Sequence, residues 1–161
     1  MLLRLKEDYD GAEPAASSVA TLNALTSAHL TGDSSALARA ERTLARYGPR
    51  IGGAARVVPM MLSALSAWHG GHLQAVVVAD SREAQRDLLS ALATLYVPFA
   101  IVVPVVSGAS QQALAARLPF LEAMRPVGGH ATAYVCRNFT CRQPVTTAGQ
   151  LRGELTREGN R

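Results

Sequence analysis

The chain has 161 residues, of which 48% are hydrophobic, 17% charged and 5% aromatic, and its formal net charge is +4. This composition is typical of a globular protein with a core of small side chains, and it excludes a disordered chain. No segment approaches the ~20 apolar residues that span a bilayer, and the start MLLRLKEDYD lacks the apolar stretch of a signal peptide. No basic run is interleaved with aromatic residues, as a nucleic-acid-binding surface would require. We therefore expect a cytoplasmic protein that binds neither membrane nor nucleic acid.

The N-terminal part of the chain carries helical patterns. Residues 10–14, Asp-Gly-Ala-Glu-Pro, predict a turn into a helix over 15–30, because proline is tolerated in a first helical turn. We expect Gly32 to end this helix and Asp33 or Ser34 to cap the next one.

Two further helices are predicted before residue 70. In the second, apolar side chains recur at helical spacing at Leu37, Ala40, Leu44 and Tyr47. We expect this helix to end at Gly48-Pro49, since glycine followed by proline is a common helix end. The third helix, over 59–69, is apolar around much of its circumference, and this pattern predicts burial on more than one side.

A different pattern begins after these helices. The β-branched run over 75–79 predicts a buried strand, a helix is expected over 82–95, and 99–106 predicts a second strand that is shortened or bent at Pro104. A strand, a helix and a strand in this order predict a βαβ unit with a right-handed crossover.

The remaining elements complete a small C-terminal unit. They are a helix over 111–117 that resumes over 120–124, a third strand over 131–136 of either direction, and a last helix over 148–157. The sequence thus predicts a mixed α/β fold: helical hairpins over 1–69, then a unit over 70–161 with a three-stranded, mostly parallel sheet and flanking helices.

Two carboxylates, Asp10 and Glu13, lie near the start of the first helix. Such a pair could act as general acid and base, or could hold sugar hydroxyls. Plain capping is the alternative, because an acidic side chain near a helix N-terminus stabilises the helix by about 0.3–1 kcal/mol. Asp10 and Glu13 are therefore the candidate catalytic residues, with capping as the competing interpretation.

The only two cysteines, Cys136 and Cys141, have four residues between them. Dithiol oxidoreductases and zinc knuckles use a two-residue spacing instead. The pair could form a reversible disulfide across a tight loop, which makes it a weak redox candidate. Two free thiols, packed or partly exposed, are the alternative and the expected state in a cytoplasmic chain.

No metal or cofactor site is predicted. The strand over 75–79 is followed by Asp80-Ser81 instead of a glycine-rich phosphate loop. The arginines along the second helix are expected to form a solvated helix face. Surface or packing roles are expected of the four histidines, His29, His69, His72 and His130.

Three stretches of the chain together carry a family resemblance. Residues 10–20 (DGAEPAASSVA), 59–65 (PMMLSAL) and 133–144 (AYVCRNFTCRQP) are similar to the C-terminal region of the YyaL-type proteins, also called spermatogenesis-associated thioredoxin-domain proteins. The resemblance implies a parent with a thioredoxin-like domain, a six-hairpin (α/α) barrel similar to sugar epimerases and glycosidases, and a tail. This chain would lack the thioredoxin domain and most of the barrel, and its Asp10 and Glu13 would lie near the mouth of the barrel cavity.

Several functions are compatible with that resemblance. The barrel implies carbohydrate processing by the parent, with a sugar-like ligand. Because three helices cannot complete a barrel site, we expect no catalysis from this chain alone. The alternatives are a non-catalytic interaction or scaffold segment, which binds the remainder of the parent or a second copy of itself, and a redox-linked segment. In the last case Cys136 and Cys141 exchange with a thioredoxin-like domain.

Overall fold

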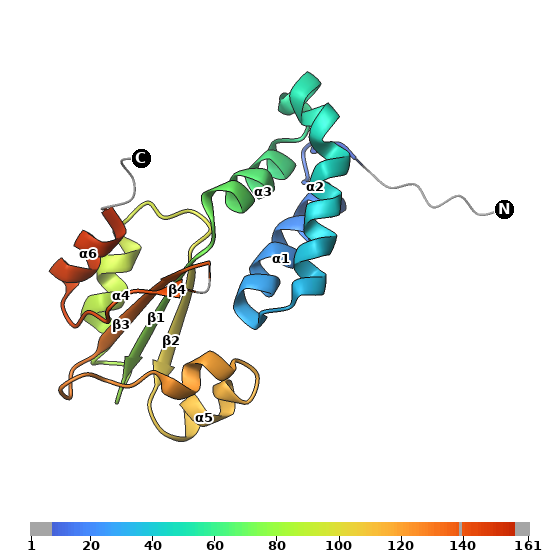
Figure 1. Cartoon of the computed structure of the whole chain (residues 1–161). Helices are drawn as coiled ribbons and strands as arrows, with labels where there is room; N and C mark the ends of the chain where they lie inside the picture. Colours follow the sequence, from blue (N-terminus) through green and yellow to red (C-terminus); the bar gives the residue numbers. More distant parts are fainter. Residues whose placement is uncertain (1–7, 139, 157–161) are drawn as a thin grey trace. The chain divides into compact units, whose positions relative to one another are not determined.

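The computed structural model describes residues 8–138 and 140–156. The chain divides into two compact units, Met1–His72 and Leu73–Arg161, which we call the helical unit and the sheet unit (Figure 1). Within the described residues, none of the helices has both the length and the hydropathy needed to cross a membrane. The mixed α/β class predicted from the sequence is confirmed.

The helical unit contains α1 (Ala16–Thr31), α2 (Ser34–Ala54) and α3 (Pro59–Gly70). Between α1 and α2, Gly32 has a φ of 75°, a left-handed conformation that glycine tolerates. Asp33 then accepts hydrogen bonds from the backbone N–H groups of Ser35 at 2.8 Å and Ala36 at 3.1 Å, so the predicted helix end and cap are confirmed. The core of this unit consists of Leu25, Ala40, Leu44, Val58, Met61 and Ala64.

The second helix is longer than the sequence predicts. α2 continues through Pro49 to Ala54, and a 3₁₀ turn, η1 (Ala55–Val57), follows it. The expected end at Gly48-Pro49 is therefore wrong. The missing proline N–H leaves the carbonyl of Ala45 without a helical partner, and Ala45 is exposed, so water can satisfy that carbonyl. Beyond Pro49, Ile51 packs against the core and anchors the last turns.

Burial on α3 also differs from the prediction. Its buried side chains are Met61, Ala64 and Ala67, which share one stripe of the helix. Leu62, on another side, is 40% exposed, and Trp68, one helical turn after Ala64, is 38% exposed. The expectation that α3 is buried on more than one side is therefore wrong for this chain.

Over its described residues, the sheet unit contains four strands in the order β2-β1-β3-β4. Their bounds are β1 (Leu73–Ala79), β2 (Ile101–Val106), β3 (Thr132–Arg137) and β4 (Thr140–Cys141). β1 and β2 are parallel, as the βαβ pattern predicts, whereas β3 is antiparallel to β1, and β4 to β3. The sheet thus has one more strand than expected and a single parallel pair. The extra strand arises because Asn138, with a φ of 45°, reverses the chain directly after β3.

Pro104 does not interrupt β2. It pairs in register with Val77 of β1, and the strand extends to Val106. β2 is an edge strand, where a proline can occur without removing a ladder hydrogen bond. The expected shortening of the strand at Pro104 is therefore wrong, and a bend at Pro104 stays a prediction.

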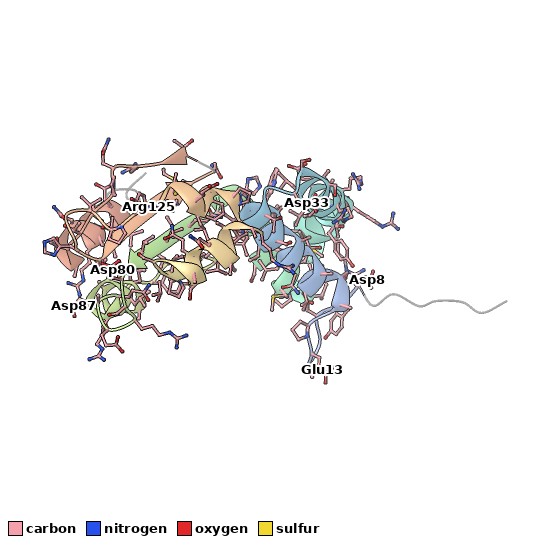
Figure 2. The ribbon with its side chains drawn as sticks, turned by 90° about the horizontal axis from the view of Figure 1, so that it is seen from below. Asp8, Glu13, Asp33, Asp80, Asp87 and Arg125 are labelled. Carbon is pink, nitrogen blue, oxygen red and sulfur yellow. A yellow bond between two sulfur atoms is a disulfide. The ribbon has the colours of Figure 1, made fainter. Side chains whose placement is uncertain are left out.

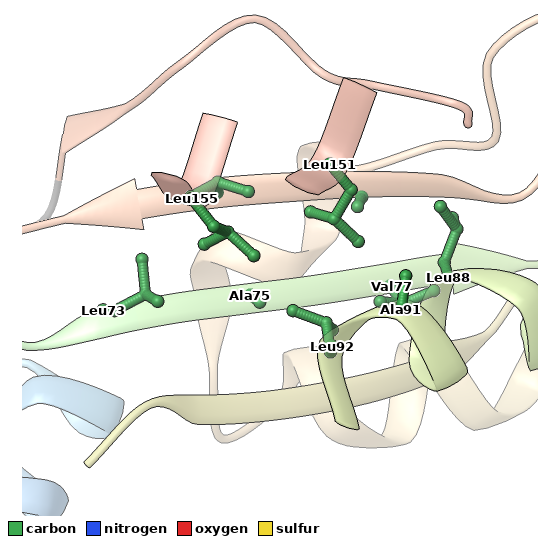
Figure 3. Close-up of a cluster of buried hydrophobic side chains, with 10 residues drawn as sticks. Leu73, Ala75, Val77, Leu88, Ala91, Leu92, Leu151 and Leu155 are labelled. Carbon is green, nitrogen blue, oxygen red and sulfur yellow. The ribbon is translucent and has the colours of Figure 1, made fainter. Parts of the chain in front are cut away.

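Two helices, α4 (Arg86–Ala93) and α6 (Ala148–Thr156), cover one face of the sheet. Figure 3 shows Leu88 and Leu92 of α4 with Leu151 and Leu155 of α6 over β1. A further helix, α5 (Ala109–Ala115), and a 3₁₀ turn, η2 (Pro119–Ala123), lie between β2 and β3 in the chain. The predicted helices over 111–117, 120–124 and 148–157 correspond to these elements, within the described residues.

α4 begins later than predicted because turns occupy the start of its expected range. Ser81 Oγ accepts a hydrogen bond from the N–H of Ala84 at 3.2 Å. Gln85, 2% exposed, then donates from its amide Nε2 to the carbonyls of Val77 at 3.0 Å and Val105 at 2.7 Å. One buried amide therefore connects β1 and β2 near their carboxyl ends.

Candidate functional site

The first candidate carboxylate, Asp10, is 7% exposed and lies where two helices begin. Its Oδ1 accepts a hydrogen bond from Ala15 N–H at 2.8 Å, and its Oδ2 accepts from Met60 N–H at 2.9 Å and Met61 N–H at 3.3 Å. Burial raises the pKa of Asp10, but these hydrogen bonds outweigh it and hold the pKa below its usual value. This geometry is that of a cap shared by α1 and α3, and a ligand contact at Asp10 stays a prediction.

The second candidate, Glu13, is exposed and belongs to the loop before α1. Figure 2 shows it at the outer edge of that loop. Its backbone carbonyl accepts a hydrogen bond from Gly11 N–H at 3.1 Å. Asp10 and Glu13 thus have different surroundings, one buried at two helix ends and the other in solvent.

The two cysteines are joined in a disulfide. The β3–β4 pairing places Cys136 directly opposite Cys141, with their Cα atoms 3.8 Å apart. The expectation of two free thiols is therefore wrong, because the tight turn at Asn138 brings the sulfur atoms together. Cys136 is 2% exposed, whereas Cys141 is exposed.

The structure brings together two histidines that the sequence separates. His29 of α1 and His72 stack with ring centroids 4.0 Å apart and an interplanar angle of 14°. His72 is 1% exposed, and neither of its ring nitrogens has a hydrogen-bond partner among the described residues. Burial, and then the charge of His29, lower the pKa of His72 to about 4, and burial lowers that of His29. His69 packs edge-on against Trp68, and His130 is exposed.

The lowered pKa of His72 predicts a loss of stability on acidification. Between pH 6.5 and about 4, the unfolded chain binds a proton at His72 that the folded chain does not, so stability is complete above 6.5 and falls toward 4. The loss should reach at most about 3 kcal/mol. Urea unfolding at about pH 7 and about pH 4.5 should show this loss in the wild type and much less of it in His72→Phe.

His130→Gln is the matched control for this experiment, because His130 is exposed. Its pH dependence should follow the wild type. Equal losses on acidification in the wild type and in His72→Phe would contradict the role of His72.

A groove of about 930 Å³ lies between α1 and α2. Its volume is within the range of small-molecule sites. Small side chains of α1, Ala20 and Ala24, leave room for it. Its hydroxyl groups come from Ser17, Thr21, Thr43 and Tyr47, and Ser17 Oγ lies 2.8 Å from the Tyr47 hydroxyl.

Four arginines of α2 line the same groove: Arg39, Arg42, Arg46 and Arg50. Their spacing of three or four residues places them along one side of the helix. The sequence predicts a solvated face for these arginines. Their spacing can be read from the sequence, but the wall that α1 forms opposite them cannot. Neither candidate carboxylate, Asp10 or Glu13, lines the groove.

In the part of the chain that the structure describes, no three side chains of His, Cys, Asp or Glu come together as a possible metal site.

The chain is similar to much longer proteins. It is 34% identical over 152 residues to human "Spermatogenesis-associated protein 20" and 33% identical over 151 residues to the rat protein of that name; each alignment covers 93% of this chain and 19% of the relative. An uncharacterized protein of Caenorhabditis elegans is 30% identical over 150 residues, which are 92% of this chain and 20% of that protein. No family model matches the chain, and no solved structure matches it.

These alignments bear on the resemblance carried by residues 10–20, 59–65 and 133–144, because they cover nearly the whole chain that contains them. The chain spans about a fifth of the length of the curated relatives. The family resemblance is therefore confirmed, and the chain is homologous to one segment of the proteins named "Spermatogenesis-associated protein 20".

Proposed function

We propose that the Cys136–Cys141 disulfide exchanges electrons with a dithiol protein of the thioredoxin type. The observation that carries this proposal is the disulfide itself, which joins a buried sulfur to one on an exposed two-residue strand. A thiolate that approaches from solvent can reach Cys141, whereas Cys136 is 2% exposed. The family resemblance supplies the class of partner.

The exchange has two steps. A thiolate of the partner attacks Cys141 Sγ, the Cys136–Cys141 bond breaks, and Cys136 leaves as a thiolate that takes up a proton. The partner's second thiol loses its proton and attacks the partner sulfur of the mixed disulfide. Cys141 then leaves as a thiolate and is protonated. The chain gains two electrons and two protons, and the partner's dithiol becomes a disulfide.

The disulfide closes only a short loop, with a sequence separation of five. A crosslink stabilises a fold by restricting the unfolded chain, and this effect falls as the loop becomes shorter. Reduction should therefore leave the sheet unit folded, as a reversible exchange requires.

The proposal is tested with a thioredoxin whose second, resolving cysteine is replaced by serine, so that a mixed disulfide accumulates. We expect a covalent adduct with the oxidised chain, in which peptide mapping finds Cys141 bonded to thioredoxin and Cys136 as a free thiol. Cys136→Ser/Cys141→Ser should give no adduct. The proposal fails if the wild type gives no adduct while the same thioredoxin attacks the disulfides of insulin, or if the adduct forms at Cys136.

A second candidate function, for the longer proteins that this segment matches, is carbohydrate binding. The observation that favours it is the groove between α1 and α2, where four hydroxyl-bearing side chains can exchange hydrogen bonds with a polyol. Glucose should then raise the melting temperature of the chain, and an unchanged melting temperature would remove this support.

A further inference from the structure

We propose that the groove between α1 and α2 binds a small phosphorylated ligand, whose phosphate is held by the guanidinium groups of Arg42 and Arg46. The inference is independent of the disulfide exchange. It deepens the carbohydrate candidate: the phosphate site stands without that candidate, and only the identity of the molecule that carries the phosphate rests on it.

The charges along the groove are compensated at its two ends. Arg50 forms an ion pair with Asp8 at 2.7 Å, and Arg39 lies 3.9 Å from Asp33. Between these pairs, Arg42 and Arg46 form no ion pair or hydrogen bond with any described residue, although both line the groove. Among the residues that the structure describes, the centre of the groove is therefore its uncompensated positive part.

The opposite wall offers no negative charge. The side chains that α1 contributes are Ser17, Ala20, Thr21 and Ala24. The acidic residue of α2, Glu41, accepts a hydrogen bond at its Oε1 from the indole nitrogen of Trp68 at 3.4 Å. Like charges four residues apart destabilise a helix, so an anion in the groove would relieve the repulsion between Arg42 and Arg46.

The residues present favour a phosphate on a small polar molecule. A guanidinium group presents a planar set of donors that matches two phosphate oxygens, and such bonds are stronger than neutral ones. The hydroxyls of Tyr47 and Ser17 belong to residues that line the same groove, and they suit the polar remainder of the ligand. The groove's volume, about 930 Å³, limits that remainder to a molecule of small size.

Titration calorimetry at low ionic strength, with inorganic phosphate as the probe and the 161-residue chain as the receptor, tests the proposal. We expect saturable binding that Arg42→Gln/Arg46→Gln weakens at least about tenfold. The matched control is Arg82→Gln/Arg86→Gln, which removes two exposed arginines four residues apart outside the groove. It should bind phosphate like the wild type, and thermal melts should show both variants folded.

Three results would overturn the proposal: no saturable binding, an equal loss in both double variants, or no loss in the groove variant. Titrations with glucose and with glucose 6-phosphate then separate it from the carbohydrate candidate. Tighter binding of glucose 6-phosphate than of phosphate or glucose supports both the phosphate site and the carbohydrate candidate. Binding of phosphate with no added affinity from the sugar supports the phosphate site alone. Binding of glucose without phosphate binding overturns the phosphate site and leaves the carbohydrate candidate standing.

Discussion

Asp10→Ala should lower the free energy of unfolding of the helical unit by about 3 kcal/mol or more. The substitution leaves the N–H groups of Ala15, Met60 and Met61 without the carboxylate that now accepts their hydrogen bonds. A hydrogen bond to a charged group contributes about 1.5–3 kcal/mol, and a buried donor without a partner costs about 1–3 kcal/mol. Since domains are stable by only about 5–15 kcal/mol, this is a large fraction of the total.

The fluorescence of Trp68, the only tryptophan, reports this transition in urea because it lies on α3, which Asp10 caps. Glu13→Ala is the matched control; its side chain is exposed, so the change should stay within about 0.5 kcal/mol. Equal effects at the two positions would refute the cap. A stable Asp10→Ala variant would favour a ligand contact at Asp10 over the cap.

Leu151→Ala should destabilise the sheet unit by about 2–5 kcal/mol. Leu151 is fully buried in the cluster that α4 and α6 form over β1 (Figure 3). Truncation removes apolar contacts and leaves a cavity that the sheet cannot close. Hydrogen exchange of the β1 amides measures the effect in this unit directly.

Leu114→Ala on α5 is the control for this experiment, because the same change is made at a side chain that is 38% exposed. It should cost much less than Leu151→Ala. If both variants lose the same stability, the cluster between α4, α6 and β1 is not the main core of the unit.

Local chemistry allowed much of the fold to be predicted. Gly32 and Asp33 mark a helix end and a cap through their own backbone and side chain, and the β-branched run of β1 indicates a buried strand by itself. Pro49 misled the prediction because packing of Ile51 beyond it outweighs a local preference. The two-residue strand β4 is too short to leave a pattern.

The candidate sites were less predictable because they depend on partners far along the chain. Met60 and Met61 reach Asp10 across about fifty residues, so spacing alone could not decide between capping and catalysis. The cysteine spacing left the disulfide open until the β3–β4 register placed Cys136 opposite Cys141. The groove needs α1 beside α2, and no property of either helix alone indicates it.

The two borders of the sheet protect the unit against strand addition by another chain, the step that leads to aggregation. On one border, Pro104 interrupts the row of N–H groups that β2 could offer a foreign strand. On the other, β4 covers one end of β3, and Val145 exchanges backbone hydrogen bonds of 2.8 and 3.0 Å with Ala133 further along. The sheet therefore ends at both sides in features that discourage growth into a fibril.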